Sequence, residues 1–194
     1  EGFLFKYKHF WGDYDHYHIS HGWYPHEIRI IRNDPDIHSW ESAQSFRRIP
    51  TFDGKNYRQQ ENTYKLKVIE LDAYVYHYGW VRPPHSMQNK KQALDTVHKG
   101  SQKVAEMYKN SPQDFDYGPL NQLAVFKETH PAVMQEWIAR FDWKSQLQYN
   151  GKPNPNRKKH KHERFKYRLI TFVERCLLGG KQIGGFQNYI RLKR

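Results

Sequence analysis

The feature that most constrains the fold is the stretch LDAYVYHYGWVRPP, residues 71–84. Residues 73–78 alternate between Ala, Val and His on one face and three tyrosines on the other, which predicts a β-strand. Gly79 permits a turn that other residues resist, and the two final prolines cannot continue a ladder. The pattern therefore predicts His77 at a strand end and Arg82 on a stiff loop, which suits a metal or a phosphate. A core histidine bonded only to backbone is the simpler alternative.

Composition limits the class of protein. The 194 residues are enough for one substantial core, and an aromatic share of 16% excludes disorder throughout the chain. The single cysteine, Cys176, cannot form an intrachain disulfide, which favours a reducing compartment and argues against a zinc knuckle. No run approaches the roughly 18 apolar residues of a membrane-spanning helix, and no signal-peptide pattern is present. We therefore expect a cytoplasmic protein.

The positive charge is concentrated near the C-terminal end. Residues 151–194 contain 13 Lys and Arg and 2 Glu, so they contribute +11 of the net charge of +12. The segment NGKPNPN at 150–156 has the composition of a linker. These observations predict a body of residues 1–150 and a basic tail of residues 151–194. The isoelectric point therefore says little about what the body does.

The periodicity of apolar residues predicts an α/β fold. Alternating patterns predict strands at residues 2–10, 27–32 and 65–70. Helical spacing predicts helices at residues 40–47, 87–108, 133–141 and 165–178. In the second helix we expect the apolar stripe to be packed in the core: Met87, Leu94, Val97, Val104 and Tyr108.

The segment after the first strand contains two patterns that metal sites use. Asp13 and Asp15 form a DxD, and carboxylates one residue apart can both reach a divalent ion from an extended chain. His16, His18 and His21 supply imidazoles, which suit transition metals. A DxD is common by chance, and this one does not follow a buried strand. We therefore expect a solvated surface loop here.

The last predicted helix, residues 165–178, is amphipathic and basic. Phe165, Leu169 and Phe172 share one face, with Lys and Arg residues beside them. Such a helix can lie in a lipid interface, where each Lys or Arg near the surface adds about 1 kcal/mol toward anionic lipid. Packing against the body is the alternative, and the pattern favours neither.

Four segments of the chain carry a family resemblance. They are EGFLFKYKHFWG at 1–12, WYPHEIRIIRN at 23–33, YHYGWVRPP at 76–84 and GKQIGGFQNY at 180–189. In combination they resemble bacterial family 2 glycosyltransferases. The third segment is the most specific and the last the least, and the resemblance covers most of the chain.

The resemblance implies a GT-A type fold, in which one α/β domain binds a nucleotide. It implies transfer of a sugar from a nucleoside diphosphate sugar to a glycan or lipid-linked acceptor. A divalent metal, Mg or Mn, would have His77 as a late ligand, and Arg82 would meet the diphosphate. Trp80 and Arg47 are implied to bind substrate.

The chain departs from the family pattern at two points. Relatives carry an Asp where this chain has Ser42, so the nearest carboxylate, Glu41, is the candidate for the base that deprotonates the acceptor hydroxyl. A Glu41 that only stabilises a helix start is the alternative. The nucleotide-contacting strands and DxD of the family would precede Glu1. We therefore expect this chain to be the C-terminal part of a transferase and to be inactive alone.

Two other classes of function stay open. A non-catalytic module could bind nucleic acid or an anionic membrane surface through residues 157–194, with aromatic rings stacking on bases. Of these two partners we expect the membrane, and hence a peripheral position on its inner face. A metal hydrolase is a weaker alternative because the sequence contains no His-Glu-x-x-His.

Overall fold

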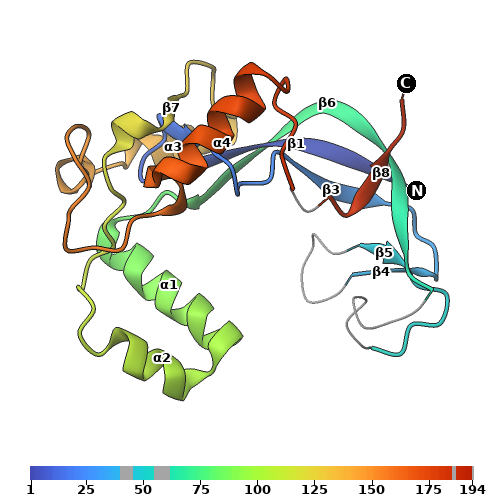
Figure 1. The fold of residues 1–194 in the computed structure, drawn as a ribbon, viewed down its shortest axis with the longest axis horizontal. Helices are drawn as coiled ribbons and strands as arrows, with labels where there is room; N and C mark the ends of the chain where they lie inside the picture. The colour runs from blue at the N-terminus through green and yellow to red at the C-terminus, as the bar shows by residue number, and fades with distance from the viewer. Residues whose placement is uncertain (40–45, 55–61, 185–186, 194) are drawn as a thin grey trace. The chain divides into compact units, whose positions relative to one another are not determined.

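The computed structural model describes residues 1–39, 46–54, 62–184 and 187–193. Within these residues the chain forms eight strands and four α-helices, which confirms the α/β class (Figure 1). Six strands hydrogen-bond in the order β4 (Ile37–His38), β5 (Arg47–Arg48), β6 (Tyr64–Trp80), β1 (Gly2–Trp11), β2 (His16–His18) and β7 (Ala124–Val125). Two further strands pair outside this path: β3 (His26–Ile31) with β1, and β8 (Tyr189–Arg191) with β6.

The chain is divided into two compact units. Unit 1 comprises Glu1–Lys8, Tyr24–Val75 and Gly180–Arg194, and unit 2 comprises His9–Trp23 and Tyr76–Gly179. Strands β1 and β6 each begin in unit 1 and end in unit 2. This division differs from the predicted boundary at residue 150, which stays a prediction.

Unit 1 is organised by strand pairing around an aliphatic core. β1 pairs antiparallel with β3, with Gly2 opposite Ile31, and β6 pairs parallel with β8, with Leu66 opposite Tyr189. The parallel pair makes the sheet a mixed one. The buried core consists of aliphatic side chains: Leu4, Ile28, Ile37, Leu66 and Val68.

The three strand predictions are confirmed, with one difference at Gly79. Residues 65–70 continue without a break to Trp80, which gives a single strand of 17 residues. A turn does span Gly79 and Trp80, because the Val81 N–H donates to the Tyr78 carbonyl oxygen at 3.0 Å, but the strand continues through it. The strand ends at Trp80, three residues before Pro83, which has no N–H to donate to a ladder.

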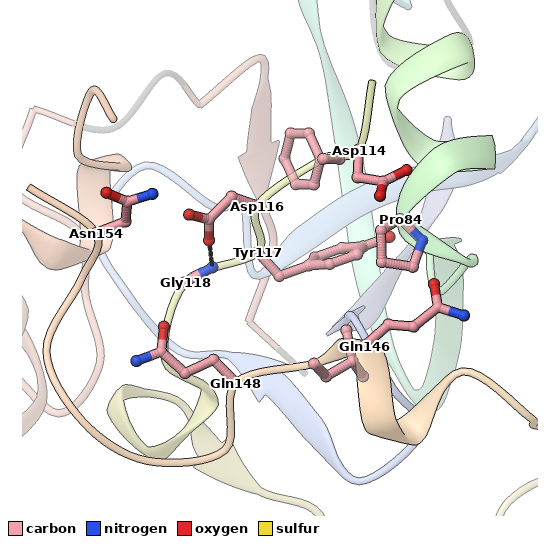
Figure 2. A pocket seen from close by; sticks show the side chains of 10 residues that line it. Pro84, Asp114, Asp116, Tyr117, Gly118, Gln146, Gln148 and Asn154 are labelled. Atoms are coloured by element: carbon pink, nitrogen blue, oxygen red, sulfur yellow. Dashed lines mark hydrogen bonds between the residues drawn. The ribbon is translucent and has the colours of Figure 1, made fainter. Parts of the chain in front are cut away.

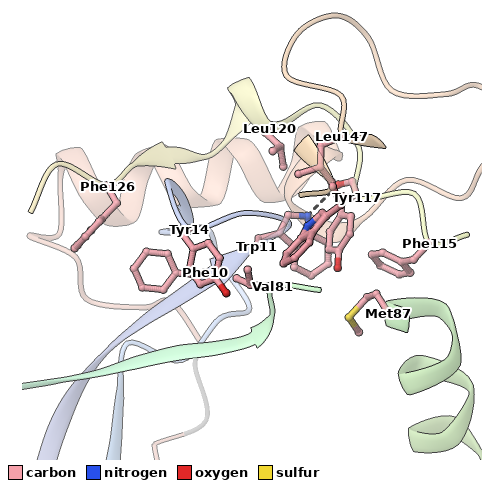
Figure 3. Close-up of a cluster of buried hydrophobic side chains, with 11 residues drawn as sticks. Phe10, Trp11, Tyr14, Val81, Met87, Phe115, Tyr117, Leu120, Phe126 and Leu147 are labelled. Carbon is pink, nitrogen blue, oxygen red and sulfur yellow. Dashed lines mark hydrogen bonds between the residues drawn. The ribbon is translucent and has the colours of Figure 1, made fainter. Parts of the chain in front are cut away.

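Unit 2 has an aromatic core. His9 in β1 lies opposite His18 in β2, and His16 in β2 lies opposite Val125 in β7. The indole Nε1 of Trp11 donates a hydrogen bond to the carbonyl oxygen of Tyr117 at 3.0 Å. Figure 3 shows the cluster that surrounds this bond, whose buried members include Phe10, Trp11, Tyr14, Val81, Met87, Phe115, Tyr117, Leu120, Phe126, Trp143 and Leu147.

The predicted helix at 87–108 is two helices, α1 (Pro84–Lys99) and α2 (Ser101–Tyr108), which lie side by side (Figure 1). Gly100 separates them with φ of 83°, a conformation that side chains disfavour. Because the helix ends at Gly100, the apolar residues of α1 and those of α2 do not form one continuous stripe. Only Met87 and Val104 of the stripe are buried, and Val97 is 81% exposed, so the predicted packing of the whole stripe is wrong.

Two further α-helices belong to unit 2. α3 (Gln135–Ala139) follows a 3-10 turn at Ala132–Met134, within the predicted helix at 133–141. α4 (Phe165–Cys176) confirms the helix predicted at 165–178. Further 3-10 turns lie at Leu120–Gln122, Lys144–Gln146 and Lys161–Glu163. None of the helices in the described part of the chain has both the length and the apolar content needed to cross a membrane.

A buried ion pair fixes the loop before α4 to the centre of unit 2. Arg157 donates two parallel hydrogen bonds to Glu163, at 2.7 and 2.6 Å, and its Nε lies 2.9 Å from Asp116 Oδ2. A Cβ at Gly118 would collide with both the Glu163 carboxylate and the Arg157 guanidinium, and Gly118 also has φ of 73°. Residue 118 must therefore be glycine for two separate reasons.

We expect Gly118→Ala to destabilise unit 2 by about 3 kcal/mol or more, because it combines backbone strain with displacement of a buried charge. Gly179→Ala is a matched control, since Gly179 also has positive φ, of 58°, but a Cβ added there would meet nothing within 4 Å. The control should lose only about 1 kcal/mol. Urea denaturation followed by tryptophan fluorescence measures both losses. Equal losses in the two variants would contradict the role assigned to the ion pair.

Candidate functional site

The junction between β6 and α1 contains most of the predicted site residues of unit 2. β6 carries His77, Gly79 and Trp80, and Pro83 caps α1, in which Pro84 is the first residue. The His77 ring is half-buried, with its Nδ1 at 3.1 Å from Nδ1 of His9 in β1. One of these nitrogens must donate and the other accept, so the ring that accepts is neutral at this position.

Gly79 allows two basic side chains to lie against the strand. A Cβ at this position would lie 2.7 Å from His77 Nε2 and 3.4 Å from Lys90 Nζ. The Lys90 ammonium group, which extends from α1, donates a hydrogen bond to the Gly79 carbonyl oxygen. The missing side chain of Gly79 therefore brings an imidazole and an ammonium group to the same point.

Two cations of this junction, Lys90 and Arg82, repel each other. Burial lowers the pKa of Lys90, and the positive charge of Arg82 lowers it further. Arg82 itself is exposed, while its carbonyl oxygen accepts a hydrogen bond from the Tyr117 hydroxyl at 2.9 Å. Two cations that raise each other's energy would both be stabilised by a bound anion.

Trp80 lies in an aromatic group within unit 2. Its ring stacks on Trp11 with centroids 4.8 Å apart, and it meets Trp23 edge-on at 5.9 Å. Its predicted role in substrate binding stays a prediction.

Two predicted site residues, Arg47 and Glu41, do not belong to the β6–α1 junction. Arg47 belongs to unit 1, where it lies in β5 opposite Lys65 rather than at the end of the predicted helix at 40–47. Glu41 falls outside the described residues. The roles predicted for both residues stay predictions.

The two carboxylates of the DxD segment differ in burial, since Asp13 is buried and Asp15 is exposed. Asp13 is 0% exposed, and its Oδ1 accepts hydrogen bonds from the backbone N–H groups of Asp15 and His16 at 3.0 and 2.8 Å. The His16 ring lies 2.9 Å from Asp13 Oδ2. The expectation of a solvated loop is therefore wrong for Asp13, whose carboxylate closes the turn between β1 and β2, and holds for the exposed Asp15.

The three histidines of this segment take different partners. His16 pairs with Asp13, His21 Nδ1 lies 2.7 Å from Glu174 Oε1, and His18 is buried. Within the described ranges no three His, Cys, Asp or Glu side chains gather closely enough to hold a metal ion. The described residues therefore do not form a complete metal site, and His77 could supply one ligand of a site that needs others.

Unit 2 contains a cluster of histidines that the sequence pattern does not predict: His18 and His162 are buried, and His160 is half-buried. His18 and His162 meet with centroids 4.8 Å apart, and His160 stacks on His162 at 5.6 Å. In the part of the chain that is described, Nε2 of His18 and Nε2 of His162 have no hydrogen-bond partner. His160 and His162 belong to a basic run that predicts a solvated tail, so nothing in the sequence marks them as buried.

A polar pocket of about 570 Å³ lies beside the β6–α1 junction (Figure 2). Its lining comes from segments of unit 2: Pro84, Asp114, Phe115, Asp116, Tyr117, Gly118, Gln146, Leu147, Gln148 and Asn154. Tyr117 joins the pocket to the junction, since its ring lines the pocket and its hydroxyl bonds to Arg82. Carboxylates, amides and an aromatic ring together offer hydrogen-bond donors, acceptors and an apolar face, which suits a ligand rich in hydroxyl groups.

Unit 1 has a pocket of about 870 Å³ whose lining includes three cations, Lys6, Arg191 and Lys193. Lys6 binds Asp72 at 2.8 Å, and Arg191 binds Glu70 at 2.8 Å. Because two of the three cations already have carboxylate partners, this pocket is less suited to an anionic ligand than the β6–α1 junction.

We expect the buried histidines to make unit 2 unstable in mild acid. Burial lowers the pKa of His162 from 6.5 to about 4, and burial with nearby histidines lowers that of His18. The unfolded chain then binds protons before the folded chain does, so stability falls as the pH drops from 7 toward 4. For His162 alone the loss is about 3 kcal/mol.

Urea denaturation at a series of pH values measures this loss. His162→Phe should flatten the decline, whereas the exposed control His85→Gln should leave it unchanged. A decline that is the same in His162→Phe and in the unmodified chain would contradict the assignment.

No protein-family model, curated protein or solved structure matches this chain. The β6–α1 junction and its pocket are therefore the features of the chain that point to a function.

Proposed function

We propose that this chain belongs to a metal-dependent glycosyltransferase of the family 2, GT-A type, and that the β6–α1 junction holds the diphosphate of a nucleotide-sugar donor. The observation that carries the proposal is the position of His77 and Lys90 at Gly79, with Arg82 three residues later in the chain. A leaving diphosphate accumulates negative charge, and fixed cations at that place stabilise it.

The three side chains can contribute different interactions. Arg82 offers a planar fork of donors that matches two phosphate oxygens, and Lys90 offers a point charge. The half-buried position of Lys90 strengthens its attraction to an anion, because water screens the charge less there.

His77 is the proposed protein ligand of a divalent cation, Mg or Mn. If His77 donates its Nδ1–H to His9, then its Nε2 carries the lone pair that a metal requires. His9 would in this way fix the orientation and the tautomer of the ligand. The remaining ligands would be diphosphate oxygens and carboxylates other than Asp13, whose oxygens already close a turn.

The pocket beside Tyr117 is the proposed acceptor site. Its volume of about 570 Å³ is in the range of small-molecule sites, and its polar lining suits the hydroxyl groups of a glycan. Asp114 is an exposed carboxylate in this lining, 3.5 Å from His85. Glu41 stays the candidate base by resemblance, and Arg47 and Trp80 stay candidate substrate contacts.

Lys90→Gln and Arg82→Gln should each weaken binding of uridine diphosphate and of inorganic pyrophosphate about tenfold or more, because each removes a charge-assisted hydrogen bond. Arg140→Gln is a matched control, since Arg140 is a highly exposed arginine elsewhere in unit 2. Isothermal titration calorimetry measures the affinities. If the control loses as much affinity as the two variants, the anion is held by general charge and not by the junction.

His77→Ala should abolish the increase in Mn²⁺ affinity that uridine diphosphate causes, because the imidazole would be a direct ligand. His85→Ala, which removes an exposed histidine of α1, should leave the increase intact. Electron paramagnetic resonance of free Mn²⁺ measures both. If uridine diphosphate raises the Mn²⁺ affinity of His77→Ala as much as that of the unmodified chain, His77 is not a metal ligand. The diphosphate contacts of Lys90 and Arg82 are tested separately by the binding measurements above.

A further inference from the structure

Helix α4 is attached to the rest of unit 2 through its polar side. The backbone N–H of His21 donates to Thr171 Oγ1 at 2.8 Å, and the His21 ring lies 2.7 Å from Glu174 Oε1. The ring also stacks on Tyr167 with centroids 5.7 Å apart. Tyr167, Thr171 and Glu174 are spaced by four and three residues, so they lie on one face of the helix. Glu174 is only 3% exposed, and this polar face is therefore the inner one.

The opposite face of α4 is an exposed apolar stripe, which we define as Phe165, Leu169, Phe172 and Cys176. Phe165 is 79% exposed, Leu169 53% and Phe172 59%, and Cys176 is also exposed. Their spacings of four, three and four residues align them along the whole length of the helix. Surface helices normally direct such a stripe toward the core and the polar face toward water. In α4 the two faces are reversed.

Basic side chains border the stripe on both sides. Lys166 lies along one edge, and Arg168 and Arg175 lie along the other, as follows from their positions in a helix of 3.6 residues per turn. All three are exposed. Glu174 is the one acidic residue in the sequence from 164 to 178, and it is buried against His21. The outer face of α4 is therefore apolar at its centre and purely cationic at its borders.

The loop before α4 adds to this positive charge. Lys158, Lys159 and Lys161 are exposed, and Glu163 is occupied by Arg157 in the buried ion pair. The carboxylate nearest in sequence is thus unable to neutralise the lysines. The positive field extends beyond the helix itself.

We propose that the outer face of α4 binds an anionic lipid bilayer surface, with the apolar stripe inserted at the boundary between headgroups and acyl chains. Bordering Lys and Arg side chains can extend to the headgroup phosphates while their alkyl parts stay with the apolar stripe. Charge complementarity identifies the partner as anionic. A nucleic acid would account for the cations and could stack bases on the two phenylalanines, but it would leave the exposed aliphatic Leu169 at the centre of the stripe unused. This inference does not depend on the proposed transferase activity.

The lone cysteine allows a direct test on the full chain. A fluorophore sensitive to polarity, attached to Cys176, should brighten and shift to shorter wavelength with vesicles of phosphatidylcholine and phosphatidylglycerol, but not with phosphatidylcholine alone. The same label on Val97→Cys in a Cys176→Ser background is the control, because Val97 is an exposed residue of α1. A control label that responds equally, or a Cys176 label that does not respond, would overturn the proposal.

Co-sedimentation with the anionic vesicles separates the two contributions. Leu169→Ser with Phe172→Ser should reduce binding about tenfold or more. Arg168→Gln and Arg175→Gln should each reduce it about fivefold and make it less sensitive to salt. The matched apolar control Val133→Ser, at an exposed position outside α4, should bind as the unmodified chain does.

Other occupants of the stripe give distinct results. The chain could instead form dimers without vesicles, and Leu169→Ser with Phe172→Ser could dissociate them. That result would show that a second copy covers the stripe, and it would overturn the proposal. Tight binding of RNA without vesicle binding would also overturn it. Every substituted side chain is exposed, so we expect the variants to keep their helices. Circular dichroism checks this.

Discussion

The structure of unit 2 depends on the burial of Trp11 at the end of β1. Its indole packs against other aromatic rings, and its N–H donates to the backbone of Tyr117, so one side chain satisfies both the apolar and the polar requirements of burial. The same backbone segment leads to Gly118, where the Arg157–Glu163 pair is held. Trp11 therefore connects the strand, the pocket lining and the loop before α4.

The sequence predicted those parts of the fold that follow from local periodicity. β1, β3, β6 and α4 were predictable because each has an uninterrupted pattern of one period. The break at Gly100 was not, since a helical stripe continues across it and only the positive φ separates α1 from α2. Local pattern cannot distinguish a glycine tolerated in a helix from one that ends it.

The candidate site was predictable only in part, for a related reason. His77 and Arg82 belong to the stretch whose pattern is strongest, whereas Lys90 and His9 join them through packing between segments distant in sequence. The half-buried His160 and the buried His162 show the same limit in the opposite direction. Their neighbours in the chain are charged and exposed, and the residues that bury them are contributed by β1 and β2.

Gly118 has a consequence for how this chain can vary in evolution. The glycine, the arginine and the glutamate form one structural unit, because the space above the Gly118 backbone is filled by the paired side chains of Arg157 and Glu163. Homologues that keep the pair must keep the glycine, whereas those that lose the pair are constrained at position 118 only by its backbone conformation, with φ of 73°. The three positions should therefore covary, while position 100 should stay glycine whether or not the pair is kept, because its φ of 83° and ψ of 152° are open essentially to glycine alone.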